Sequence, residues 1–290
     1  MAEATPAPRA ALRPHVVRTR RELRAALASA PRPIGLVPTM GALHQGHASL
    51  IRRARAESAT VVATIFVNPG QFNETADFEK YPRDEAADLA VAREAGADVV
   101  FIPTVEEVYP AGFQTTVRVG ALTEPLEGAA RPGHFEGVTT VVAVLLCLVG
   151  AERAYFGQKD AQQLLVVRRM ALDLGIPTEI VACPIVREPD GLAMSSRNVR
   201  LTPEQRAAAR VLHASLLAAR AAYEAGERDG VALRAAIRGV LAAEPLAVPE
   251  YVSCADSATL RELARVEGPG LLSLAVRFGS VRLIDSDSLP

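Results

Sequence analysis

The sequence predicts an α/β protein in which a parallel sheet covered by helices precedes a smaller α+β domain. Its 290 residues suffice for about two domains. Short apolar runs alternate with helical patterns from residue 34 to residue 183, as in strands joined by crossover helices. The run 60–67 is almost entirely apolar or β-branched, which indicates a strand buried on both faces. After residue 186 the pattern changes to alanine-rich helices and three final strand-like runs.

The first part of the chain is expected to form a Rossmann-like parallel sheet. The expected strands are 34–38, 60–67, 98–102, 154–156 and 178–183. The expected helices are 47–57, 84–95, 137–149 and 161–174. Gly96 and Gly175 stand where two of these helices should end. Ligands of such sheets bind beyond the carboxyl ends of the strands, so the loops after residues 37, 67 and 156 are the places for a site.

The second part begins with a helix signal at Thr202, followed by proline and then by Gln205, as in a capping box. Alanine-rich helices are expected over about 203–226 and 229–243, and strands over 249–255, 271–278 and 281–284. Residues 1–14 are rich in Pro, Ala and Arg and have no periodic apolar pattern, so we expect a disordered tail. The expected domains are therefore 15–186 and 187–290.

Composition excludes several classes of protein. With 32 basic and 33 acidic residues the formal charge is −1, which argues against a protein that binds the nucleic-acid backbone. The longest apolar run, 138–149, is far shorter than the roughly 20 residues that span a bilayer. Cys147, Cys183 and Cys254 form no C-x-x-C motif and cannot all pair, which favours a reducing cytoplasm.

The first candidate motif is the segment 38–47, between a strand and a helix. Gly41 and Gly46 allow a tight turn and close approach of a ligand. The unpaired N–H groups of the helix N-terminus attract an anion. His44 and His47 fall in the same turn and can donate to phosphate oxygens. This pattern favours a phosphate site.

Other interpretations of this segment stay open. The glycine spacing is that of a P-loop, but His47 replaces its lysine and Ala48 its Ser/Thr. A zinc site would need a third ligand, and the other histidines are dispersed. Both histidines could also be core residues whose ring nitrogens are hydrogen-bonded within the protein.

Two further motifs supply cations. Only two of the 32 basic residues are lysine, Lys80 and Lys159, and Lys159 lies in the sequence GQKD between a strand and a helix. The second motif is Met194-Ser-Ser-Arg197, whose hydroxyls, amides and guanidinium can wrap a triphosphate. Taken singly, each could be a solvated turn or surface loop.

Neutral amides form the last candidate set. Asn68 and Gln71 follow the most apolar strand, and Gln163 stands one helical turn beyond Lys159. Amides can bind a hydroxyl or a carboxylate without adding charge, although each could be a surface residue.

The G-x-S-x-G, H-E-x-x-H and G-x-G-x-x-G motifs are absent. The remaining chemistry is catalysis by fixed cations and dipoles. These groups would stabilise the negative charge that builds on a departing pyrophosphate, as nucleotidyl transfer requires.

The sequence resembles the pantothenate synthetase, or pantoate–β-alanine ligase, family. The matching stretches run in the family's order from about residue 34 to 200: PTMGALHQGHASLI, IFVNPGQF, DFEKYPRD, RPGHFEGVTTVV, YFGQKDAQQL and REPDGLAMSSRN. The His-x-Gly-His element alone would indicate only the wider nucleotidyltransferase superfamily. The resemblance implies that 15–186 is a nucleotidyltransferase domain that binds ATP and pantoate. It also implies that 187–290 contributes the MSSR loop.

The resemblance further implies a two-step reaction with Mg²⁺ in a cytoplasmic homodimer. ATP adenylates (R)-pantoate with release of pyrophosphate, and β-alanine then displaces AMP to give pantothenate. The alternatives are an adenylyltransferase that stops after the first step and a non-catalytic nucleotide-binding protein.

Site residues also follow from the resemblance. His47, His44, Lys159 and Arg197 would be catalytic. The ATP contacts would be Met40, Gly41, His44, Gly46, His47, Gly157, Lys159, Asp160, Val186, Met194, Ser195, Ser196 and Arg197. Pantoate would contact Gln71, Gln163 and Met40, and β-alanine would contact Gln71 and Asn68. Asp88 is the candidate for an indirect Mg²⁺ contact. Gly70 replaces the family's methionine, and we expect it to loosen the wall of the pantoate pocket.

Overall fold

The computed structural model describes residues 13–73 and 78–290, so most of the expected N-terminal tail lies outside the described residues. The first part forms a six-stranded sheet in the order β1-β4-β3-β2-β5-β6, and its paired strands are all parallel. The strands are β1 His15–Val17, β2 Ile34–Thr39, β3 Thr60–Ile65, β4 Val99–Phe101, β5 Arg153–Gly157 and β6 Glu179–Cys183. The predicted parallel sheet is therefore confirmed, and β1 is a strand that the sequence pattern did not reveal.

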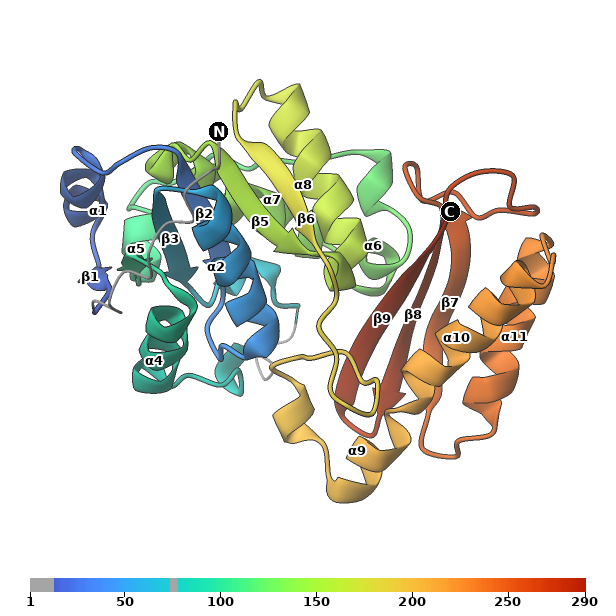
Figure 1. Cartoon of the computed structure of the whole chain (residues 1–290). Helices are drawn as coiled ribbons and strands as arrows, with labels where there is room; N and C mark the ends of the chain where they lie inside the picture. The colour runs from blue at the N-terminus through green and yellow to red at the C-terminus, as the bar shows by residue number, and fades with distance from the viewer. Residues whose placement is uncertain (1–12, 74–77) are drawn as a thin grey trace, which may run out of the picture.

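Helices cover both faces of this sheet (Figure 1). They are α1 Arg20–Leu27, α2 Gln45–Glu57, α4 Glu85–Ala95, α5 Val105–Val108, α6 Glu127–Ala130, α7 His134–Val149 and α8 Ala161–Asp173. Leu36 of β2 packs into the core shared with α1, α7 and α8, whereas its neighbour Val37 packs into the core shared with α2 and α4. Successive side chains of a strand point to opposite faces, which is why these strands are apolar at every position.

The four predicted helices of this part are present, and in the described ranges α1, α5 and α6 were not predicted. α7 begins three residues earlier than expected, at His134. Gly96 and Gly175 end their helices with φ of +97° and +63°, a left-handed conformation that glycine adopts without strain. The unpredicted helices α1, α5 and α6 are short or polar, so they carry little apolar periodicity.

The second part packs helices on one face of an antiparallel sheet of order β7-β8-β9. Its elements are α9 Pro203–Ala208, α10 Val211–Glu224, α11 Gly230–Ala242, β7 Val248–Asp256, β8 Gly270–Phe278 and β9 Val281–Leu289. The capping box is confirmed, because Thr202 and Gln205 each accept a hydrogen bond from the other's backbone N–H.

The prediction of one helix over 203–226 was wrong. The chain turns at Ala209 and Arg210, and α9 and α10 are separate. Neither glycine nor proline marks this break in the alanine-rich run. Ala208, Ala209 and Leu212 are all buried in the core of the second part, so tertiary packing sets the turn.

The two faces of the C-terminal sheet differ. Leu272, Leu274 and Val276 of β8 pack against α10 and α11. The opposite face of the sheet, which carries Ser273 and Arg282, lies towards the first domain (Figure 1). Cys183 is packed in a core of the first part, and Leu192 is packed in the core of the second part. The domain boundary expected at residue 186 stays a prediction.

No helix within residues 13–73 and 78–290 is both long enough and apolar enough to cross a membrane.

Candidate active site

The loops that follow β2, β3, β5 and β6 meet at one cavity of about 210 Å³. It lies beyond the carboxyl ends of the parallel strands, where a ligand of such a sheet is expected. Fifteen of the predicted site residues line it: Met40, His44, Gly46, His47, Asn68, Gln71, Gly157, Lys159, Asp160, Gln163, Val186, Met194, Ser195, Ser196 and Arg197. Gly41 and Asp88 do not line it. The structure thus brings together residues from position 40 to position 197. We call this cavity the nucleotide cleft, after the ligand that the sequence predicts for it.

Local hydrogen bonds orient the two histidines. His44 is the N-cap of α2, and its Nδ1 accepts the N–H of Gly46 at 3.1 Å. Nδ1 of His47 accepts the N–H of His44 at 3.3 Å, and the two ring centroids lie 4.1 Å apart. A Cβ at Gly46 would come within 2.8 Å of the His44 ring. This position therefore needs glycine.

Both imidazoles are neutral at pH 7. Burial lowers the pKa of His44 to about 4. Burial, reinforced by His44 and Lys159, lowers the pKa of His47 to about 3. Because each Nδ1 accepts a backbone N–H, the ring proton resides on Nε2. The turn therefore offers two neutral N–H donors rather than two cations.

Asp88 holds this turn from α4. Its Oδ2 accepts the N–H of Ala42 at 3.0 Å and its Oδ1 accepts the N–H of Leu43 at 2.6 Å. Gly41 has φ of +85°, and a Cβ there would approach Oδ2 of Asp88 to 2.9 Å. Gly41 and Asp88 thus shape the turn, although neither lines the cleft. The indirect Mg²⁺ contact of Asp88 stays a prediction.

The amide wall of the cleft follows β3. Asn68 is buried, and its Nδ2 donates to Oε1 of Gln71 and to the carbonyl of Gly137, both at 3.1 Å. Its Oδ1 accepts from Tyr109 Oη at 2.7 Å and from the N–H of Gly70 at 3.2 Å. Both polar atoms of Asn68 therefore have partners. Its contacts orient Gln71, and its predicted contact with β-alanine stays a prediction.

Gln71 is held on its backbone side as well. Its carbonyl accepts from His134 Nδ1 at 2.8 Å and from Arg131 at 3.1 Å. Burial and the neighbouring Arg131 lower the pKa of His134 to about 4. Nε2 of Gln71 lies 3.0 Å from Sδ of Met40, so these two side chains meet across the cleft.

Sequence reasoning gave Tyr109, Arg131 and His134 no role. Arg131 and His134 occur in the quoted segment RPGHFEGVTTVV, which was the available signal.

Gly70 does not line the cleft, and a Cβ there would make ordinary contacts with Asn68 and Gly137. Its expected effect on the pocket wall stays a prediction.

Lys159 and Asp160 follow β5 in a short 3₁₀ turn and line the same cleft as the histidines. Nζ of Lys159 lies 3.4 Å from Oδ2 of Asp160. Burial raises the pKa of Asp160, but Lys159 and Arg197 outweigh it, so the net pKa lies below its usual value. The ammonium of Lys159 is thus only loosely paired with Asp160, and it faces the space where a ligand would bind.

The MSSR loop is attached to the histidine turn. Ser196 Oγ donates to the carbonyl of Ala42 at 3.0 Å, and the N–H of Arg197 donates to Ser195 Oγ at 3.2 Å. The N–H of Met194 donates to the carbonyl of Val186 at 3.0 Å. The loop from the start of the second domain therefore completes one wall of the cleft.

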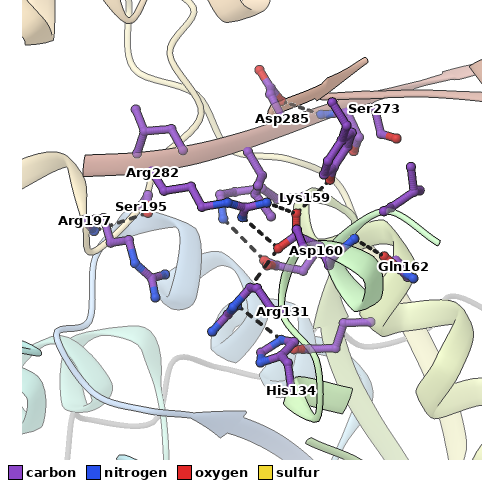
Figure 2. A pocket seen from close by; sticks show the side chains of 18 of the residues that line it. Arg131, His134, Lys159, Asp160, Gln162, Ser195, Arg197, Ser273, Arg282 and Asp285 are labelled. Atoms are coloured by element: carbon purple, nitrogen blue, oxygen red, sulfur yellow. Dashed lines mark hydrogen bonds and ion pairs between the residues drawn. The ribbon is translucent and has the colours of Figure 1, made fainter. Parts of the chain in front are cut away.

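A second cavity of about 330 Å³ adjoins the cleft between the first domain and the C-terminal sheet (Figure 2). The two cavities share five lining residues: Lys159, Asp160, Gln163, Ser195 and Arg197. Figure 2 shows Arg282 reaching from the C-terminal sheet towards the segment that carries Asp160 and Gln162. We call this second space the interface cavity.

No group of three or more His, Cys, Asp or Glu side chains in the described ranges is arranged to hold a metal ion. Asp160 is the predicted ATP-contacting acid that lines the cleft. Magnesium commonly keeps water and substrate phosphates as most of its ligands. The donor set therefore fits a magnesium ion that arrives with a nucleotide better than a resident metal.

Comparison with known proteins agrees with this geometry. Residues 15–287 match the pantoate-beta-alanine ligase family. Pantothenate synthetase of Roseiflexus castenholzii is 60% identical over 271 residues, which cover 93% of this chain and 98% of that protein.

Solved structures are similar too. The crystal structure of pantothenate synthetase from Thermus thermophilus has a TM-score of 0.91 and 50% identity, and covers 94% of this chain and 98% of its own. The pantoate-beta-alanine ligase of Francisella tularensis, complexed with beta-gamma ATP and β-alanine, has a TM-score of 0.78 and 32% identity, over 94% and 97% of the two chains. From this agreement of sequence, fold and site, the chain belongs to the pantoate–β-alanine ligase family.

Proposed function

We propose that this chain condenses (R)-pantoate with β-alanine to pantothenate at the expense of ATP, through a pantoyl-adenylate intermediate. The observation that carries the proposal is the nucleotide cleft. There, neutral N–H donors of His44 and His47 and the cations of Lys159 and Arg197 face the amide wall of Gln71.

In the first step a carboxylate oxygen of pantoate attacks the α-phosphorus of ATP, and the bond to the bridging oxygen of pyrophosphate breaks. Negative charge builds on the departing pyrophosphate. Lys159 and Arg197 stabilise that charge, and His44 and His47 donate Nε2–H to phosphate oxygens. The donors are already oriented by backbone hydrogen bonds, so little reorganisation is needed during the reaction.

Gln71 and Gln163 bind pantoate through hydrogen bonds in this proposal. A cation in their place would form a tight ion pair with the attacking carboxylate. Such a pair would lower the ground state and weaken the nucleophile. Asn68, Tyr109, Arg131 and His134 position Gln71 for this task.

In the second step the neutral amine of β-alanine attacks the acyl carbon of the adenylate. The bond from this carbon to the phosphate oxygen of AMP breaks, and the amine loses a proton. A one-step adenylyltransferase is not favoured, because the Francisella relative is complexed with both beta-gamma ATP and β-alanine.

Magnesium is proposed as the partner of ATP, held chiefly by the phosphates of ATP, with Asp160 as the nearest acid of the cleft.

Two further proposals rest on the family resemblance: the site of the reaction is the cytoplasm, and the working form is a homodimer. Light scattering of the purified chain would measure its mass in solution, and a monomer at the assay concentration would contradict the dimer.

The test of the reaction is product analysis with ATP, Mg²⁺ and (R)-pantoate, with and without β-alanine. We expect pyrophosphate exchange that requires pantoate, and AMP and pantothenate formation that requires β-alanine. ADP in place of AMP would contradict an adenylate. Exchange without amine-dependent turnover would support the one-step alternative.

A further inference from the structure

Glu127, in the short helix α6, joins the two domains at a buried point. Arg282 of β9 donates to both of its carboxylate oxygens at 2.8 Å, and Tyr251 Oη of β7 donates to Oε1 at 2.8 Å. The side chains of Glu127 and Arg282 are only 10% and 15% exposed. Two separate strands of the C-terminal sheet thus converge on one carboxylate of the first domain.

Glu127 is also attached to the start of α8. Its backbone N–H donates to Oε1 of Gln162 at 2.9 Å. Nε2 of Gln162 donates to the carbonyls of Leu122 and Pro125 at 2.9 and 2.8 Å. Gln162 is buried, and it stands directly before Gln163 and two residues after Asp160. The carboxylate that holds the C-terminal sheet is therefore connected to the first turn of α8.

The same sheet contacts the turn before α8 at a second point. Ser286 Oγ of β9 donates to the carbonyl of Gln158 at 3.1 Å. Gln158 immediately precedes Lys159. Docking of the C-terminal sheet therefore supports the Lys159 turn directly, through Ser286, and indirectly, through Glu127 and Gln162.

A row of serines crosses this face of the sheet. Ser253, Ser273 and Ser286 are cross-strand neighbours in one row. Among the described residues, the buried hydroxyls of Ser253 and Ser273 have no hydrogen-bond partner. The interface cavity opens beside this row, since Ser273 and Ser286 line it. Leu271 and Ala275 flank this row on the same face and are buried. At the row itself the contact is polar and incompletely filled, so specific polar contacts contribute to holding the domains together.

We propose that Glu127 is a positioning residue that couples docking of the C-terminal domain to the placement of Lys159 and Gln163 in the nucleotide cleft. The inference rests on the proposed ligase activity for its kinetic readout. Loss of the carboxylate charge leaves Arg282 buried with only its second partner, Glu250, and removes the attraction that seats the sheet. The Lys159 turn then loses support, and the adenylate becomes accessible to water.

The test compares Glu127→Gln with Asp287→Asn. Asp287 accepts two hydrogen bonds from Arg220, at 2.6 and 2.5 Å, but this pair lies wholly within the C-terminal domain. It therefore matches the chemistry of the Glu127–Arg282 pair without joining the domains. Each variant is assayed for kcat, for KM of ATP, and for pantoyl adenylate lost per pantothenate formed, and small-angle X-ray scattering measures its radius of gyration.

For Glu127→Gln we expect kcat to fall about 10- to 100-fold, in line with the effect of a misplaced catalytic group. KM for ATP and the loss of adenylate should rise, and the radius of gyration should increase. Asp287→Asn should stay within about threefold of the parent in all kinetic terms, because neither Asp287 nor Arg220 lines either cavity. Equal behaviour of the two variants would overturn the proposal.

Tyr251→Phe provides a milder variant if Glu127→Gln does not fold. It removes one hydrogen bond to Glu127 and keeps the ion pair with Arg282, so a smaller change in the same direction is expected. A Tyr251→Phe enzyme with unchanged kcat, adenylate loss and scattering would contradict the coupling. Scattering needs no turnover. If the parent chain forms no pantothenate and Glu127→Gln still increases the radius of gyration, the proposed reaction is refuted and the domain contact stands.

Discussion

The nucleotide cleft and the interface cavity share Lys159 and Asp160 but are built by different means. In the cleft, His44, Gly46 and His47 hold one another through neighbouring backbone groups, and the imidazoles are neutral. At the interface, Glu127 meets Arg282, a charged partner 155 residues away in the sequence. Local hydrogen bonds preform the histidine turn of the cleft, whereas the interface depends on how two domains dock. Mutations in the cleft should therefore affect chemistry directly. Mutations at the interface should affect stability and domain closure, and chemistry only through closure.

The two lysines of the chain give the largest expected contrast. Lys159 lines both cavities, whereas Lys80 lines only the interface cavity. Lys159→Ala should lower kcat about 10³-fold, the effect of removing a preorganised group that stabilises transition-state charge. This corresponds to about 4 kcal/mol of barrier. Lys80→Ala is the control and should change kcat less than about threefold. Comparable losses of kcat in the two variants would mean that the two cavities do not differ in their importance for catalysis.

The interface pair gives the next largest effect, on stability. Arg282→Ala leaves the buried Glu127 with the more distant Arg131, 4.0 Å away, as its ionic partner and should lower the free energy of unfolding by about 3 kcal/mol. Arg220→Ala breaks the more exposed pair with Asp287, whose side chains are 31% and 25% exposed, and should cost about 1 kcal/mol. Urea denaturation monitored by circular dichroism measures both. A larger loss for Arg220→Ala would mean that burial does not distinguish the pairs.

Asp88 offers an intermediate test inside the first domain. Asp88→Ala removes the acceptor of two backbone N–H groups, and we expect a loss of about 2 kcal/mol in the free energy of unfolding. KM for ATP should rise because the histidine turn is less well held. Titration of Mg²⁺ separates the two roles of this residue. If extra Mg²⁺ restored the variant's activity, the predicted metal contact would be supported over the positioning role.

The smallest effect is expected from pH on adenylation. With pKa values of about 4 for His44 and about 3 for His47, both rings stay neutral from about pH 6 to about pH 8. Pantoate-dependent pyrophosphate exchange should therefore show no inflection in that range. A loss of activity with a midpoint near pH 6.5 would mean that the imidazoles titrate as they do in water.

The same shifts make stability depend on pH in a defined direction. Burial lowers the pKa of His44, His47 and His134 below the ordinary value of 6.5. Below that value the unfolded chain binds protons that the folded chain does not. The folded state is therefore unaffected by these groups above about pH 6.5 and is progressively destabilised by them towards about pH 4. Thermal denaturation across this range would measure the effect, and replacing His134 by glutamine should reduce it.

Much of the first domain was predictable because its determinants are local. Continuous apolar runs identified β2 and β3, and Gly96 and Gly175 marked where helices end. The histidine turn was predictable for the same reason, since two glycines and two histidines within seven residues act on one another directly. β1 and α6 escaped prediction because they are short and become strand and helix only through partners distant in the sequence.

The sequence by itself determined the apolar strands, the capping box at Thr202 and the motifs that line the cleft, because neighbouring residues define them. Only the tertiary structure decided that α9 and α10 separate, that Arg131 and His134 support Gln71, and that Glu127 meets Arg282 and Tyr251. The physical reason is distance along the chain. A buried charge or amide is stable only where the fold supplies its partner. Sequence spacing does not reveal a partner that lies 60 residues away, as Arg131 does from Gln71, or 155 residues away, as Arg282 does from Glu127.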